Sequence, residues 1–230
     1  MTRLRQYINA PGRYKRSRGY GVHSPFAFYF IRRVLCERTP YYDYEAITTL
    51  RQQALDKVRH IKGHSHVMSL KHAKMIYRIL CHYKPVTMLQ IGSTHGLTTA
   101  TALLYDPKLH ITLYDNRSGH NDQQRVSVID DIEPILRATT GDPTTPPPFP
   151  VVVISDLRPE DRARVTTLLR RHTDMGGVTI VRNLSNDSNI SELWRALTHT
   201  MERGMSFTNA KIGIITGDRD LPLHHYKLWF

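Results

Sequence analysis

Cysteines, long apolar runs and acidic residues are all scarce in this sequence of 230 residues. Cys36 and Cys81 are the only cysteines. Neither lies in a spacing typical of metal or redox sites, so we expect two reduced packing residues. No apolar run approaches the roughly 20 residues needed to cross a bilayer, and residues 1–21 lack the apolar segment of a secretory signal. These absences predict a cytoplasmic protein with no membrane partner.

The shortage of acidic residues makes the chain basic. Lysine and arginine number 32 against 20 acidic residues, which gives a net charge of +12. Charge of this size attracts polyanions without specifying one. Cationic residues and tyrosines alternate near the N-terminus, before any acidic residue. They are Arg3, Arg5, Tyr7, Arg13, Tyr14, Lys15, Arg16, Arg18 and Tyr20. Two interpretations stay open: an arm that contacts RNA or DNA, or a solvated basic tail that docks on its own domain. The second is favoured because no recognisable nucleic-acid module follows.

The length and composition suit one α/β domain with an appendage. Hydrophobic residues make up 40% of the chain, enough for a core. In the N-terminal part, residues 1–84, the stretch 1–21 is predicted to be irregular because prolines and glycines interrupt it. A helix is predicted from Ser24, where serine suits the N-cap and Pro25 the first turn. The predicted helices of this part span 24–38, 44–61 and 70–82.

Residues 85–230 are organised around the stretch VTMLQIGSTHGLTTATALL at 86–104. An apolar strand, a turn with Gly92 and Gly96, and a helix follow one another there. Dinucleotide-type sites begin in this way, because glycine lets the backbone approach a ligand and the helix offers free N–H groups. A second apolar run ends in Asp115, and a carboxylate at that position accepts hydrogen bonds from ribose hydroxyls. The glycines alone are equally compatible with a tight turn that binds nothing.

Strands and helices alternate along the rest of the chain. The predicted strands are 87–91, 111–114, 125–129, 151–154 and 178–181, and the predicted helices are 97–105, 132–138, 159–173 and 190–201. Too few residues separate the last two strands, 211–216 and 225–230, for a crossover helix, so we expect these strands to pair antiparallel. The pattern predicts an α/β, Rossmann-like, doubly wound sheet whose ligands lie at the carboxyl ends of the strands.

Several of these motifs resemble those of class I S-adenosylmethionine-dependent methyltransferases. LQIGSTHGLTTA is similar to their first motif, YDN to their ribose-binding motif, and VVVISD to their fourth-strand motif. The segment RGYGVHSPFAFYFI resembles an extension of small methyltransferase-like proteins, many from the Bacteroidetes, and LPLHHYKLWF resembles their final strand. The resemblance implies a seven-stranded sheet ending in an antiparallel hairpin, S-adenosyl-L-methionine as cofactor, and methyl transfer as activity.

The resemblance also implies a set of cofactor-binding residues. The methionine end would contact the glycine turn and its neighbours, which are Gln90, Gly92, Ser93, Thr94 and Gly96. Asp115 would bind the ribose, and Asp130 or Asp131 would face the adenine amino group.

The catalytic candidates implied by the resemblance are Asp156, His95 and His23. Asp156 would lie by the sulfonium and the methyl acceptor. His95 lies in the cofactor turn, and His23 belongs to a segment that could cover the pocket as a lid. Either histidine could remove a proton from the acceptor. A packing or surface role is the alternative for both.

Three features depart from the family pattern. Gln90 stands where an acidic residue is common, so the charge that would hold the methionine ammonium is missing. Few residues separate Asp115 from the next strand, so the usual helix there is shortened or absent. Arg182 stands beside Asn183, where relatives use oxygen ligands for a divalent metal. Its positive charge would oppose such an ion, so we expect no metal.

The sequence therefore leaves more than one function open. The first is methyl transfer to an unidentified acceptor, an O-methyltransferase being the finer hypothesis. The alternative is a catalytically degenerate methyltransferase fold that acts as a binding or scaffold module for an anionic partner. A nucleic-acid-modifying enzyme rests on the charge alone, because the N-P-P-Y-type motif of adenine methylation is missing. The aromatic residues Phe26–Phe30 leave a homodimer open.

Overall fold

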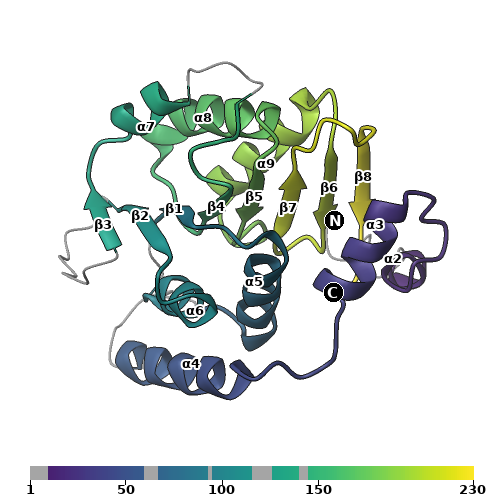
Figure 1. The fold of residues 1–230 in the computed structure, drawn as a ribbon, viewed down its shortest axis with the longest axis horizontal. Coiled ribbons are helices and arrows are strands. Elements are labelled where there is room, and N and C mark those ends of the chain that lie inside the picture. The colour runs from purple at the N-terminus through teal and green to yellow at the C-terminus, as the bar shows by residue number, and fades with distance from the viewer. Residues whose placement is uncertain (1–9, 60–66, 93–94, 116–125, 140–144) are drawn as a thin grey trace.

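The computed structural model describes residues 10–59, 67–92, 95–115, 126–139 and 145–230. An eight-stranded sheet runs through this part of the chain, in the order β3-β2-β1-β4-β5-β7-β6-β8 (Figure 1). Its strands are β1 (Thr87–Ile91), β2 (His110–Tyr114), β3 (Val126–Ile129), β4 (Val151–Ile154), β5 (Val178–Val181), β6 (Met205–Thr208), β7 (Gly213–Thr216) and β8 (His224–Lys227). Strands β1 to β5 are parallel, which confirms the predicted Rossmann-like, doubly wound α/β fold.

The middle of the sheet consists of strands buried on both faces. Every residue of β4 and β5 is buried, and their β-branched side chains suit such positions. Successive residues of β1 enter opposite cores, because side chains alternate across a strand. Met88 belongs to the cluster that includes Ile76 and Leu80, whereas Leu89 belongs to the cluster that includes Leu168 and Leu193. Packing on both faces fixes the carboxyl ends of these strands relative to one another.

Helices cover both faces of the sheet (Figure 1). On one face lie α5 (Leu70–Tyr83) and α6 (Leu97–Tyr105), and α4 (Tyr44–Val58) packs against these two helices on the side away from the sheet. On the other face lie α7 (Glu133–Ala138), α8 (Arg162–Asp174), which follows the 3₁₀ turn η2 (Pro159–Asp161), and α9 (Ser188–Thr200). No helix within the described ranges has the length and apolar character needed to span a bilayer.

The predicted pairing of the last two strands is wrong. Strand β6 was not predicted. It forms an antiparallel hairpin with β7, and β8 pairs parallel with β6. Asn209 makes the hairpin turn, because its Oδ1 accepts hydrogen bonds from the backbone N–H groups of Lys211 and Ile212. Strand β7 then lies between β5 and β6 and has no free edge, so β8 joins the outer edge of β6 and the sheet has eight strands instead of seven.

The N-terminal part is more regular than predicted. Helix α2 (Ala10–Ser17) forms within the stretch expected to be irregular, because Pro11 and Gly12 fall in its first turn, where proline costs no helical hydrogen bond. The helix expected over 24–38 is divided into α3 (Pro25–Phe30) and a π-helix, η1 (Ile31–Leu35). Ser24 caps α3 as predicted, since its side chain accepts from the backbone N–H of Ala27.

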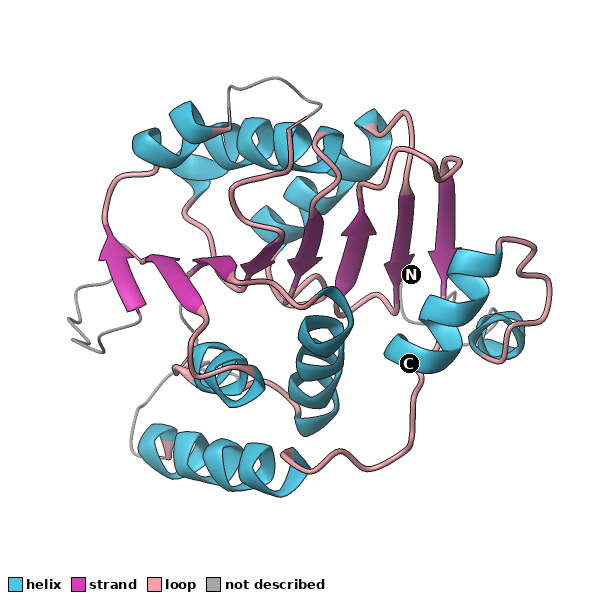
Figure 2. Cartoon of the chain, viewed as in Figure 1, coloured by secondary structure: helices cyan, strands magenta, loops and turns pink. Residues whose placement is uncertain are grey.

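The N-terminal helices share a core with the sheet. Phe30 is completely buried, and its ring centroid lies 5.1 Å from that of Phe207 in β6. Helix α2 is tied to the end of β8, because Arg13 Nε donates to the carbonyl of Leu228 at 3.1 Å and Ser17 Oγ accepts from the N–H of Trp229 at 2.7 Å. Figure 2 shows α2 and α3 beside this edge of the sheet, on the side away from β3.

We predict that Phe30→Ala destabilises the whole chain. Removal of a fully buried ring leaves a cavity, so the free energy of unfolding should fall by about 3–5 kcal/mol in chemical denaturation. The transition should remain single, because α3 and the sheet share one core. Tyr42→Ala is the control, since Tyr42 is 98% exposed and its loss should have little effect. A separate early transition confined to the N-terminal helices would contradict the shared core.

Candidate functional site

The turn after β1 begins with Gly92, a position where any residue other than glycine would be strained. Gly92 has φ +72°, and a Cβ built there would lie 2.8 Å from both the Cβ and the backbone N of Asp156. The strand ladder continues into this turn, since Gly92 N–H donates to the Tyr114 carbonyl and Ser155 N–H to the Ile91 carbonyl. The segments that follow β1 and β4 are therefore in direct contact at the carboxyl edge of the sheet.

The same turn ends at the start of α6. His95 and Gly96 both have left-handed backbone, with φ +61° and +68°. A Cβ at Gly96 would meet no heavy atom within 4 Å, so open space lies beside this Cα. His95 is half-buried, and its pKa is lowered by burial and by the charge of Arg182. Its imidazole is therefore neutral at neutral pH and can accept a proton.

A small crevice joins the ends of β1, β2 and β4. Gly92, Asp115 and Asp156 line it, together with Tyr114, Leu157, Arg158 and Asp161. We call this space the nucleotide crevice. Asp115 thus lies at the end of β2 beside the glycine turn, as the sequence predicted. The nucleotide crevice brings together three of the predicted site residues.

A hydrogen-bonded cluster forms one wall of the nucleotide crevice. Tyr114 Oη donates to Asp161 Oδ2 at 2.8 Å, and Arg158 donates to the same carboxylate oxygen at 2.9 Å. Burial and the bond to Asp161 raise the pKa of Tyr114, so this phenol stays protonated. The cluster fixes the segment after β4 against the end of β2. No sequence motif pointed to this cluster, whose members come from β2, the segment after β4 and η2.

Gln90 lies beneath the turn instead of lining the nucleotide crevice. It is completely buried. Its Nε2 donates to the Gly92 carbonyl at 3.2 Å, and its Oε1 accepts from Thr99 Oγ1 at 2.9 Å. Both ends of the amide thus hold the glycine turn to α6. An uncharged amide suits a fully buried position better than the carboxylate of the family pattern.

The two acidic residues after β3 are exposed. Asp131 Oδ1 accepts from the backbone N–H of Glu133 at 3.0 Å, so it caps the first turn of α7. Neither Asp130 nor Asp131 lines the nucleotide crevice. Ser93 and Thr94, also predicted to bind cofactor, lie outside the described residues.

A buried arginine follows β5. Arg182 is only 3% exposed, and its guanidinium donates to Thr98 Oγ1 of α6 at 3.1 Å and to Ser155 Oγ at 2.7 Å. Burial lowers its pKa to about 10, so it remains a cation at neutral pH. Among the described residues, no group of three or more His, Cys, Asp or Glu side chains could hold a metal ion.

A cleft of about 1170 Å³ opens beside the end of β5. We call it the β5 cleft, and its lining includes His72, Arg182, Asn183, Asn209 and Trp229. His72 Nε2 lies 3.4 Å from Asn209 Nδ2. Burial, then the charge of Arg182, lower the pKa of His72 to about 4, so this ring is neutral. No sequence motif pointed to His72, because α5 precedes the sheet and only the fold places this residue beside the end of β5.

His23 is not brought to this edge. It is exposed, and it precedes α3, which packs on β6. Strands β4, β5 and β7 separate β6 from β1 in the sheet. The described structure therefore places the two predicted histidines in different regions, His95 in the turn and His23 near the far edge.

Comparisons with known proteins identify the fold. No protein-family model matches the chain, and no curated protein is similar to it in sequence. The structure of cofactor-bound Rv0187 from MTB is 14% identical; the match covers 78% of this chain and 98% of that chain, with a TM-score of 0.53. SAH-bound methyltransferase PaMTH1 from Podospora anserina is 13% identical, with coverages of 78% and 98% and a TM-score of 0.52. This chain shares with both structures a Rossmann-like, doubly wound α/β fold.

We predict that Gly92→Ala destabilises the chain more than Gly96→Ala. Both substitutions place a side chain in left-handed backbone, which costs about 1–2 kcal/mol. Only the Gly92 variant also forces a methyl group against the backbone of Asp156. The free energies of unfolding, measured by chemical denaturation, should rank wild type above Gly96→Ala and Gly96→Ala above Gly92→Ala. Equal losses in the two variants would contradict the close contact between the segments after β1 and β4.

Proposed function

We propose that this protein is an S-adenosylmethionine-dependent methyltransferase with an unidentified acceptor, and that it is an O-methyltransferase. One observation carries the proposal: the glycine turn after β1 packs against Asp156 and shares the nucleotide crevice with Asp115. A turn, a ribose-type carboxylate and a residue after β4 are thereby combined at the carboxyl edge of a doubly wound sheet, where such folds bind their ligands.

The types of residue at this edge fit the cofactor, although the nucleotide crevice itself has a volume of only about 20 Å³. Backbone at Gly96 borders open space, which allows a ligand to approach the start of α6 and its N–H groups. The carboxylate of Asp115 offers acceptors for the two ribose hydroxyls. The cofactor would supply a methyl group on a reactive sulfonium. SAH-bound PaMTH1, which has the same fold, supports this assignment.

The protein's own contribution is alignment of the acceptor and removal of its proton. The β5 cleft, next to the buried Arg182, is the space proposed for the acceptor. Two groups at the carboxyl edge are candidates to receive the proton, although neither lines the β5 cleft itself: the carboxylate of Asp156 in the nucleotide crevice and a ring nitrogen of the neutral His95 in the turn. His72 lines the cleft but is a poor general base at neutral pH, because its pKa is about 4. His95 is therefore the stronger candidate of the two histidines.

We predict that Asp115→Ala weakens binding of S-adenosylhomocysteine at least tenfold in titration calorimetry. The carboxylate should form charge-assisted hydrogen bonds worth about 1.5–3 kcal/mol. Asp115→Asn, which keeps one acceptor oxygen, should bind with intermediate affinity. Asp220→Ala is the matched control, because Asp220 is an exposed carboxylate in the turn after β7.

The titrations test the cofactor and the role of Asp115 separately. Wild-type protein that shows no binding at millimolar S-adenosylhomocysteine would overturn the methyltransferase proposal and favour a scaffold on the same fold. Tight binding that survives in Asp115→Ala would retain the cofactor and remove Asp115 from its site.

A further inference from the structure

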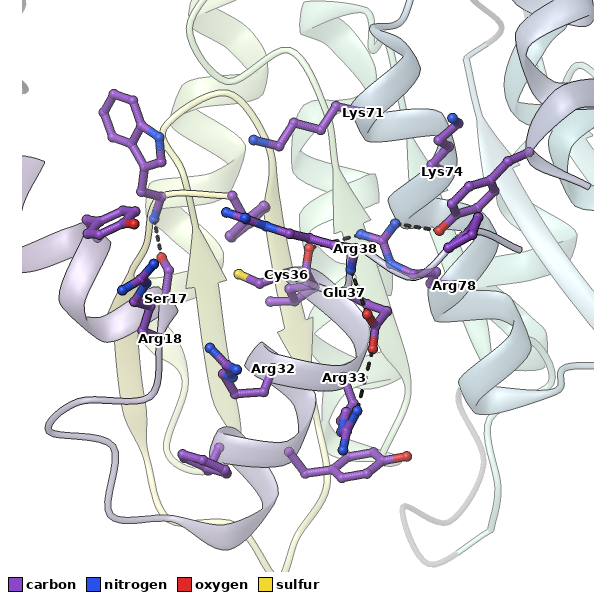
Figure 3. A pocket seen from close by; sticks show the side chains of 18 of the residues that line it. Ser17, Arg18, Arg32, Arg33, Cys36, Glu37, Arg38, Lys71, Lys74 and Arg78 are labelled. Atoms are coloured by element: carbon purple, nitrogen blue, oxygen red, sulfur yellow. Dashed lines mark hydrogen bonds and ion pairs between the residues drawn. The ribbon is translucent and has the colours of Figure 1, made fainter. Parts of the chain in front are cut away.

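A wide groove lies away from the nucleotide crevice, between the N-terminal segment, α5 and the C-terminal residues. It has a volume of about 1430 Å³, and we call it the basic groove. Its cationic residues come from four places: Arg18 follows α2, Arg32 and Arg33 belong to η1, Arg38 lies in the next loop, and Lys71, Lys74 and Arg78 belong to α5. Figure 3 shows the charged ends of Arg18, Arg32, Arg38 and Lys71 around the space next to Cys36.

The basic groove has a large excess of positive charge. Within the part of the chain that the structure describes, seven lysine and arginine side chains line it, against the single carboxylate of Glu37. That carboxylate is already engaged, because it accepts from the backbone N–H groups of Arg38 and Thr39 and lies 3.9 Å from Arg33. These bonds lower the pKa of Glu37. Glu37 therefore stays ionised, but its single negative charge leaves the groove strongly positive.

The floor of the basic groove is held rigidly. Buried Arg78 donates to the carbonyls of Val34 and Leu35 at the end of the π-helix η1, and also to Tyr44 Oη. The last carbonyls of a helix have no partner within it, and the guanidinium donates to these two. Lys74 Nζ lies 4.6 Å from the centre of the Tyr44 ring. This arrangement fixes η1 and the exposed Arg32 and Arg33 against α5.

Exposed aromatic rings are concentrated in the same groove. Among the described residues, six aromatic side chains are exposed, and five of them line it: Tyr14, Tyr20, Phe28, Tyr29 and Trp229. Tyr20 is the most exposed of the five, at 67%. Large apolar rings on a surface cost free energy unless a partner covers them. Because the rings and the cations line the same groove, one partner should account for both.

We propose that the basic groove binds single-stranded nucleic acid. Lysine and arginine attract the phosphates, and exposed rings offer stacking platforms for bases that are free of a duplex. A polyanion without bases would use the charges and leave the rings uncovered. A paired duplex would hide its base faces from the rings. A single strand uses both features of the groove.

The basic groove adjoins the β5 cleft. Lys71, Trp229 and Phe230 line both spaces. A strand held in the groove would thus approach the end of β5, where the acceptor of the proposed methyltransferase would lie. Binding of the strand does not depend on that activity. The two proposals can fail separately, because one is tested with an oligonucleotide and the other with S-adenosylhomocysteine.

The test is fluorescence anisotropy of a labelled single-stranded RNA of about 12 nucleotides, a typical length for such sites. We expect the double variant Arg32→Glu/Lys71→Glu to bind at least tenfold more weakly than wild type, with a shallower dependence on salt. Arg164→Glu/Arg195→Glu carries the same charge change on exposed positions of α8 and α9, on the opposite face of the sheet. This control should bind as wild type does.

Stacking is tested separately from charge. Tyr29→Ala should weaken binding about tenfold and Tyr29→Phe should not, because the ring stacks and the hydroxyl is not needed. An abasic strand of the same length and charge should bind wild type weakly and should not distinguish the two Tyr29 variants. Thermal melting and calorimetry with S-adenosylhomocysteine should show that every variant is folded and keeps its cofactor site.

Three results would overturn the proposal. The first is absence of RNA binding by wild type in low salt. The second is equal loss in the groove variant and the control variant, which would mean attraction by net charge alone. The third is equal affinity for the abasic and the normal strand, which would leave a general polyanion site in place of a nucleic-acid site.

Discussion

Contact between the segments after β1 and β4 is the constraint on which the candidate site depends. At Gly92 the chain comes so close to Asp156 that no side chain fits between them. Parallel strands alone bring their carboxyl ends to one edge, but this contact closes the edge into a crevice. Gln90, bonded to Gly92 and Thr99 beneath the turn, fixes the position of the turn from below. The residue that departs from the family pattern therefore supports the site structurally.

Two buried arginines hold together segments that are distant in the sequence. Arg78 joins α5 to the end of η1 through backbone carbonyls, and Arg182 joins the end of β5 to α6 and to Ser155. A guanidinium is suited to this role, because its fork of donors satisfies several acceptors at once. One anchor lies beneath the basic groove and the other beneath the β5 cleft, so both spaces have rigid floors.

The periodicity of apolar residues and the positions of turn and cap residues were sufficient to predict much of this fold. Strands 87–91, 151–154 and 178–181 were predicted with the bounds observed, because short apolar runs, β-branched throughout in the last two, are typical of strands buried on both faces. The proximity of Gly92, Asp115 and Asp156 was also predictable, because each residue comes just after a predicted parallel strand. The pairing of β8 could not be predicted, since it depends on β7 being enclosed by its neighbours. The basic groove could not be predicted from the sequence either, because its residues lie near both ends of the chain and on α5 and only the fold brings them together.

The attachment of α2 to the end of β8 also affects how the molecule meets its neighbours. A strand at the edge of a sheet presents unpaired backbone groups that can recruit another chain. Just beyond β8, Ser17 Oγ accepts a hydrogen bond from the N–H of Trp229, and Arg13 Nε donates one to the carbonyl of Leu228. The protein's own helix thus covers this end of the edge and hinders addition of a foreign strand, which is protection against edge-to-edge aggregation.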